Sequence, residues 1–182
     1  NPMRAAGVAI ITRASPTTVL REKAETLSTP GRNIGVIMPL VQKEDGNNDP
    51  WHNSIAIRTT YGITSGTQRY QPTDRRSDIA LNTSLTLEMD RAASAHARIT
   101  IASGDDNLIV KPETDAPPPS KDRYGVHPEA HLSRRLNELG FTDALRSRIG
   151  HDEQIITFKT ARDCLHGSYL DHILVKGAGV EN

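Results

Sequence analysis

The stretch 98-RITIASGDDN-107 decides the interpretation of this chain. Its first half alternates large apolar side chains with small or polar ones, and a period of two is typical of a β-strand with unlike faces. Gly104 then permits a sharp backbone turn where the strand ends. Asp105 and Asn107 stand two residues apart, so we expect their side chains to point to the same side of the sheet.

A carboxylate and an amide at this spacing have the residue types for phosphoryl chemistry. Asp105 can accept a proton from water or bind a hard cation, and Asn107 can donate to a phosphoryl oxygen without adding negative charge. The same residue types also form ordinary Asp- and Asn-rich turns after strands. Spacing alone does not separate the two interpretations.

Further strands and helices are predicted on both sides of this stretch. Runs of strand length, rich in β-branched residues, occur at 7–12, 33–38, 54–60, 98–103, 155–160 and 170–176. Residues 73–95 contain neither Pro nor Gly and carry apolar side chains at helical spacing, which predicts a long amphipathic helix. A second helix is predicted over 128–139, before Gly140. Residues 15–27 fit either a helix or a hairpin arm. Alternating strands and helices indicate an α/β fold.

The composition suits one globular domain over residues 1–182. The 182 residues are 36% hydrophobic, and 22 Lys and Arg balance 22 Asp and Glu, so any binding of nucleic acid needs a local positive patch. The lone Cys164 cannot form an internal disulfide, which favours a reducing, intracellular compartment. Neither a signal peptide nor an apolar run of about 18 residues is present, so we expect no membrane partner. Because the sequence begins at Asn1 rather than Met, we expect a piece of a longer protein.

Four segments, in this order, resemble one known family. They are 99-ITIASGDDNLIVKPETD-115, 136-LNELGFTDALR-146, 156-ITF-158 and 167-GSYLDHILV-175. The first is similar to the passage around the Gly-Asp-Phe-Asn motif of the endonuclease/exonuclease/phosphatase family, with Asp106 in place of Phe. This family includes apurinic-site endonucleases, DNase I-like nucleases and retroelement endonucleases. Upstream, residues 7–11 and 57–61 resemble two earlier strands, the second of which ends at the family's tyrosine.

The resemblance implies a fold and a set of site residues. The fold is an α/β, two-layered (four-layer α/β/β/α) sandwich of DNase I-like type, incomplete at both ends. Asp105 would orient or deprotonate the attacking water, and Asn107 would contact the phosphate in the transition state. Tyr61 would hydrogen-bond that phosphate, and Asp171 would lie on the strand whose Asp orients the catalytic His. Asp105 and Asn107 would bind Mg²⁺, or Mn²⁺ in its place, which offsets charge on the phosphoryl oxygens.

Several departures from the family pattern also bear on activity. The family's metal-site Asn and Glu precede the equivalent of Gly7, and its final Ser-Asp-His would lie beyond Asn182. Losing a general acid or base lowers a rate by roughly 10²- to 10⁴-fold, so we expect little or no activity from this piece alone. Tyr61 lacks the Pro that follows two residues later in the family. Asp106 adds a carboxylate that would either repel phosphate or face water.

The function that this resemblance implies is metal-dependent phosphodiester hydrolysis of nucleic acid, DNA foremost, by the endonuclease part of a retroelement polyprotein. One alternative is a phosphatase or lipid phosphodiesterase of the same superfamily. Another is a catalytically dead remnant that acts only as a binding or structural module. No particular protein partner is indicated.

Two charged pairs permit a functional interpretation beside a structural one. Arg134 and Arg135 can contact a nucleic-acid backbone, although paired charges on a helix are usually only solvated. Asp171 and His172 resemble a catalytic Asp-His pair, but adjacent residues of a strand face opposite sides. We therefore expect these two not to act together directly.

Overall fold

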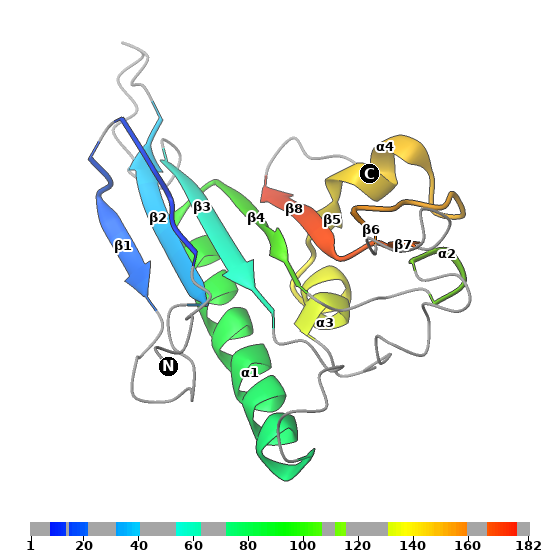
Figure 1. Cartoon of the computed structure of the whole chain (residues 1–182). Helices are drawn as coiled ribbons and strands as arrows, with labels where there is room; N and C mark the ends of the chain where they lie inside the picture. The colour runs from blue at the N-terminus through cyan, green and yellow to red at the C-terminus, as the bar shows by residue number, and fades with distance from the viewer. Residues whose placement is uncertain are drawn as a thin grey trace.

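The structure, a computed structural model, describes residues 8–13, 15–21, 32–40, 54–62, 72–106, 112–115, 131–159 and 167–177. Its main feature is a six-stranded mixed sheet with the strand order β1-β2-β3-β4-β8-β5 (Figure 1). The strands are β1 Thr18–Arg21, β2 Asn33–Pro39, β3 Ser54–Tyr61, β4 Ile99–Asp105, β5 Thr142–Asp143 and β8 Asp171–Gly177. A separate pair is formed by β6 Phe158–Lys159 and β7 Gly167–Ser168. The helices are α1 Pro72–His96, α2 Pro112–Asp115, α3 His131–Asn137 and α4 Ala144–Ile149.

Helix α1 connects the two parallel strands of the sheet. β3 and β4 pair in parallel, whereas the other pairs of the large sheet are antiparallel. A parallel pair needs a crossover connection, and the 25 residues of α1 provide it behind the sheet in Figure 1. Consequently β3 and β4 end at the same edge of the sheet, where β8 begins.

The core lies on the sheet face that α1 covers. Along β3 the even-numbered residues are buried and the odd-numbered ones are half-buried, as alternation in a strand requires. One apolar cluster joins β2 and β3 to α1 through Ile37, Ala56, Ala93 and Ala97. A second cluster packs Phe141 against Ala102 of β4 and Leu174 of β8. These two clusters hold α1 and the segment after α3 against the same face.

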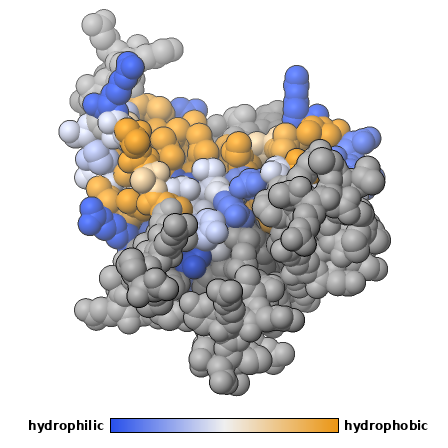
Figure 2. Space-filling model, viewed as in Figure 1, coloured by the Kyte–Doolittle hydropathy of each residue, from blue (hydrophilic) through white to orange (hydrophobic). Residues whose placement is uncertain are grey.

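The opposite face of the sheet is apolar and partly exposed. Ile57 of β3 and Ile101 of β4 are half-buried there, and Ile173 of β8 is 52% exposed. Figure 2, which views the molecule from this side, shows apolar side chains across the strands. The facing sheet that the family resemblance implies is not formed by the described residues.

Most of the predicted strands and the long helix are confirmed. Strands 33–38, 54–60, 98–103 and 170–176 correspond to β2, β3, β4 and β8, and helix 73–95 corresponds to α1. Of residues 15–27, 18–21 form β1, a hairpin arm that pairs with β2.

Two strand predictions failed wholly or in part. A strand over 7–12 is wrong, because residues 8–13 form no ladder, and Ile11 is 97% exposed. Of the predicted strand over 155–160, residue 160 lies outside the described residues, and among 155–159 only 158–159 are in a strand. The short helix α4 was not predicted.

Candidate active site at the sheet edge

Three of the four predicted site residues come together at one edge of the sheet. In the strand register, Tyr61 of β3 pairs with Asp105 of β4, and Asp105 pairs with Asp171 of β8. Paired residues on neighbouring strands project to the same face, so these side chains are neighbours, although they are far apart in sequence. Tyr61 and Asp105 are half-buried and Asp171 is exposed. Asn107 lies outside the described residues, and its role remains a prediction.

Two glycines permit the close backbone packing that places Asp105. The Gly62 N–H donates to the Asp105 carbonyl oxygen at 2.6 Å. A Cβ at Gly62 would lie within 3.0 Å of the Asp106 carbonyl group. Gly104 has φ +150°, and a Cβ there would lie within 3.0 Å of the Thr60 carbonyl group. Only glycine fits at both positions, so the ends of β3 and β4 are held at a fixed separation.

Arg32 extends this arrangement by one strand. The Tyr61 N–H donates to the Arg32 carbonyl oxygen at 2.8 Å. In return, Arg32 Nη1 donates to the carbonyl oxygens of Tyr61 and Gly62 at 3.2 and 3.1 Å. The guanidinium carbon lies 5.2 Å from the centre of the Tyr61 ring. A cation is thereby held beside Tyr61, and guanidinium groups are well suited to bind phosphate.

We refer to Arg32, Tyr61, Asp105 and Asp171 as the edge row. The sequence around Arg32 carries no pattern that predicts a site. Its place is seen only because β2 runs antiparallel to β3, so that the residue before β2 meets the residue that ends β3. The edge row thus combines one cation, one phenol and two carboxylates.

The two carboxylates of the edge row are suited to a hard divalent cation. Like charges on paired strand positions repel each other, and a bound cation relieves that repulsion. Mg²⁺ commonly binds through one or two carboxylates and keeps several waters. A group of three or more His, Cys, Asp or Glu side chains arranged to hold a metal does not occur among the described residues. Asp105 and Asp171 therefore fit a metal ion that remains partly hydrated.

Asp106 and Arg135 do not have the environments predicted from the sequence. Asp106 was expected to face water or to repel phosphate, but it is only 1% exposed. Arg135 Nη1 donates to its carboxylate at 3.2 Å. Arg135 itself is buried, so the favoured prediction of a solvated charge on the helix surface is wrong, and the side chain is not accessible to nucleic acid. Arg134 forms a surface ion pair with Glu138.

These two residues belong to a larger set of buried charges, which we call the charge cluster: Arg58, Asp90, Arg135 and Asp106. Arg58 Nε donates to Asp90, and Arg135 Nε lies 2.6 Å from the other Asp90 oxygen. Burial lowers the pKa of the Arg58 guanidinium, and the Arg135 cation lowers it further, whereas Asp90 and Asp106 oppose both. The cluster connects β3, α1, α3 and the turn after β4.

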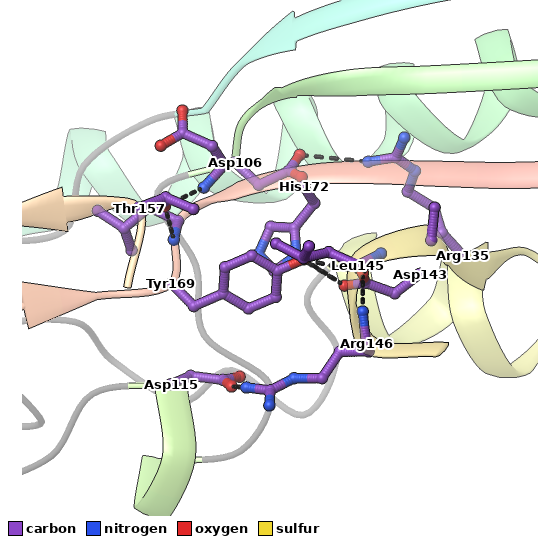
Figure 3. Close-up of polar contacts among 12 residues, drawn as sticks. Asp106, Asp115, Arg135, Asp143, Leu145, Arg146, Thr157, Tyr169 and His172 are labelled. Carbon is purple, nitrogen blue, oxygen red and sulfur yellow. Dashed lines mark hydrogen bonds and ion pairs between the residues drawn. The ribbon is translucent and has the colours of Figure 1, made fainter. Parts of the chain in front are cut away.

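A second polar site surrounds Asp143, which caps the N-terminus of α4. Its carboxylate accepts from the Tyr169 hydroxyl at 2.8 Å and contacts His172 Nδ1 at 3.1 Å (Figure 3). Burial alone would raise the Asp143 pKa, but hydrogen bonds from His172, the Arg146 N–H and Tyr169 outweigh it, so the pKa is lowered. Burial and the Asp143 charge raise the pKa of Tyr169.

This second site borders a cavity of about 640 Å³. Tyr169, His172 and Asp143 line it, together with Arg146, which forms an ion pair with Asp115. His172 is buried whereas Asp171 is exposed, as expected for adjacent strand residues. The two side chains therefore lie on opposite faces of the sheet.

Comparisons with known proteins identify the fold. No family model matches the chain, and no curated protein matches its sequence. The 3′ phosphatase NExo from Neisseria, bound to a product DNA hairpin, is similar in structure with a TM-score of 0.64 at 18% identity, over 91% of this chain and 60% of that one. The Xenopus laevis APE2 catalytic domain has a TM-score of 0.59 at 18% identity, over 84% of this chain and 48% of that one. An AP endonuclease from Archaeoglobus fulgidus has a TM-score of 0.56 at 20% identity, over 88% and 58%.

The chain thus spans about 60% or less of the length of these solved structures. Within the described part of the chain, no helix is long and apolar enough to cross a membrane. The order of the strands and helices and the structural similarity agree with the predicted fold class. The described part of the chain has an α/β fold similar to part of these 3′ phosphatase, APE2 and AP endonuclease structures.

Proposed function

We propose that this protein hydrolyses phosphodiester bonds in nucleic acid, DNA foremost, with the help of a divalent metal ion. The observation that carries the proposal is the edge row, because separate strands bring a cation, a phenol and two carboxylates together. The fold supports it, since similar structures include an AP endonuclease and a 3′ phosphatase bound to product DNA. The family resemblance further favours the endonuclease part of a retroelement polyprotein.

Each member of the edge row has a role in this proposal. Arg32 and the Tyr61 hydroxyl bind the phosphate oxygens and orient the phosphorus atom. Asp105 accepts a proton from the attacking water, and Asn107 donates to the phosphate as charge develops. Mg²⁺, or Mn²⁺ in its place, would be held by Asp105 with Asn107 or Asp171, and would offset charge on the phosphoryl oxygens.

The rate of the 182-residue chain is proposed to be low. The described residues place no imidazole beside Asp105 and Asp171, because the nearby His172 faces the other side of the sheet. Without a general acid to protonate the leaving oxygen, a loss of roughly 10²- to 10⁴-fold is typical. A catalytically dead module is the alternative to this proposal.

Nicking of supercoiled plasmid tests the proposal. The wild-type chain in Mg²⁺ is compared with Asp105→Asn and with Glu88→Gln, which removes an exposed carboxylate of α1. We expect nicking that EDTA abolishes, a loss of at least about 10²-fold in Asp105→Asn, and no change in Glu88→Gln. Equal nicking by both variants would refute the role of Asp105, and no nicking by any sample would favour the dead module.

Removal of a terminal phosphate from DNA is the second candidate, because the fold is also that of a 3′ phosphatase. An oligonucleotide that ends in a 3′ phosphate separates the two functions. Release of inorganic phosphate without nicking of intact plasmid would favour the phosphatase. Hydrolysis of a lipid phosphodiester has no supporting observation in the described residues.

A further inference from the structure

The charge cluster connects the middle of the sheet to the turn that carries Asp105. Arg58 contacts Asp90, Asp90 contacts Arg135, and Arg135 contacts Asp106. Cations and carboxylates alternate along this path, and all four residues are at most 1% exposed. Asp106, the last of them, is the neighbour of Asp105 in the chain. A side chain of helix α3 thus contacts the residue that directly follows Asp105.

Burial of these charges is not explained by stability alone. A buried ion pair often stabilises a protein no more than an apolar pair of similar volume, because both charges lose their water. The cluster is also incompletely hydrogen-bonded, since Arg58 Nη2 and Arg135 Nη2 find no partner among the described residues. What ion pairs at fixed geometry can provide is a defined arrangement of the groups that they connect.

The geometry of the turn shows how Arg135 acts on Asp105. Adjacent residues of a strand point to opposite sides, so Asp106 points inward to Arg135 while Asp105 belongs to the edge row. The Asp106 N–H donates to the Leu170 carbonyl oxygen at 2.9 Å, and the Gly62 N–H donates to that of Asp105. Two backbone hydrogen bonds and the ion pair between Arg135 and Asp106 thus hold this turn in place.

We propose that Arg135 is a positioning residue for Asp105, and that its ion pair with Asp106 fixes the turn where the resembling family has a phenylalanine. The consequence for activity rests on the proposed function, but the consequence for the turn does not. Helix α3, which carries Arg135, would then contribute to the edge row without touching a substrate.

Amide hydrogen exchange in the full chain tests this proposal without any need for activity. Wild type is compared with Arg135→Met and with Ser54→Ala, a control that breaks the hydrogen bond from Ser54 to the His96 carbonyl oxygen at the opposite end of β3. After correction for intrinsic exchange, the rate for Ala102 in mid-β4, which reports global unfolding, is subtracted from the rates for Gly62 and Asp106, and each remainder is expressed as a ratio to its wild-type value. We expect this ratio to rise about tenfold in Arg135→Met and to stay constant in the control.

A double variant separates positioning from stability. Asp106→Leu with Arg135→Met removes both charges of this ion pair and leaves the Arg58–Asp90 pair, so the free energy of unfolding should recover in part while the exchange ratio stays raised. If Arg135→Met does not fold, Asp106→Asn provides the same comparison, with the ratio again expected to rise. An unchanged ratio in the folded variants would overturn the proposal. If wild type nicks plasmid, Arg135→Met should lower kcat and leave KM unchanged. If wild type does not nick plasmid, the exchange ratios still test the proposal.

Discussion

Replacement of Asp90 by asparagine removes the central charge of the buried cluster without changing its shape. Asp90 is fully buried and contacts two guanidinium groups, those of Arg58 and Arg135. One ion pair contributes about 4 kcal/mol at 4 Å and an effective dielectric constant of 20. The cost of removing the Asp90 carboxylate from water offsets part of the attraction that its two ion pairs provide. Since loss of one partner from a buried pair typically costs about 3–5 kcal/mol, we expect a loss in this range for Asp90→Asn.

Urea unfolding followed by circular dichroism measures this loss. Small domains have about 5–15 kcal/mol of stability in total, so the midpoint should fall by a large fraction. The loss should persist in 0.5 M salt, because buried pairs are weakly screened. Glu138→Gln, which breaks the exposed pair with Arg134, is the control and should leave the midpoint unchanged. A loss of unfolding free energy below about 1 kcal/mol for Asp90→Asn would contradict the inference that the ion pairs of Asp90 stabilise the fold.

Three further predictions concern other parts of the molecule. Because the pKa of Asp143 is lowered in the folded state, its stabilisation is complete above the ordinary carboxyl pKa of about 4 and is lost as the pH falls through the folded pKa. The difference in unfolding free energy between wild type and Asp143→Asn should therefore stay constant from pH 6 down to about pH 4 and shrink below it, and a difference that does not shrink below about pH 4 would contradict the shift. Gly104→Ala should destabilise the chain by about 1–3 kcal/mol, seen as a lower Tm, because its Cβ would collide with the Thr60 carbonyl group. Arg32→Ala should weaken the binding of a short single-stranded DNA, measured by fluorescence anisotropy, by roughly tenfold at low salt and less at high salt. Equal binding by wild type and variant would contradict a role of Arg32 in binding phosphate.

The elements with regular sequence patterns were predictable from sequence. β3 and β4 alternate with a period of two, and α1 is a long segment without Pro or Gly, so local physics decides their structure. Residues 8–13 also have the composition of a strand, but no described segment pairs with them. A strand needs a partner, and sequence composition does not reveal whether one is present.

The candidate site was predictable only in part. Tyr61, Asp105 and Asp171 follow from the family motifs, and the strand register places them together. Arg32 was missed because only the antiparallel pairing of β2 with β3 brings it to Tyr61.

The buried charges were missed for another reason, since charged residues are expected at the surface. Asp90 follows Asn82 and Thr86 at intervals of four along α1, so the three form a polar stripe. This stripe faces Asn33 and Arg58 on the sheet. A charged residue within an apolar strand, as Arg58 is, is the signal that could have indicated such a cluster.

Binding of a divalent ion at the edge row tests the central claim most directly. Calorimetry with Mg²⁺, and broadening of amide resonances with Mn²⁺, are applied to wild type, Asp105→Asn and Glu88→Gln. We predict that wild type and Glu88→Gln bind the ion, that Mn²⁺ broadens the resonances of Tyr61 and Asp171 first, and that Asp105→Asn loses both effects. Equal binding by all three proteins, or broadening centred elsewhere, would contradict a metal-dependent site at Asp105.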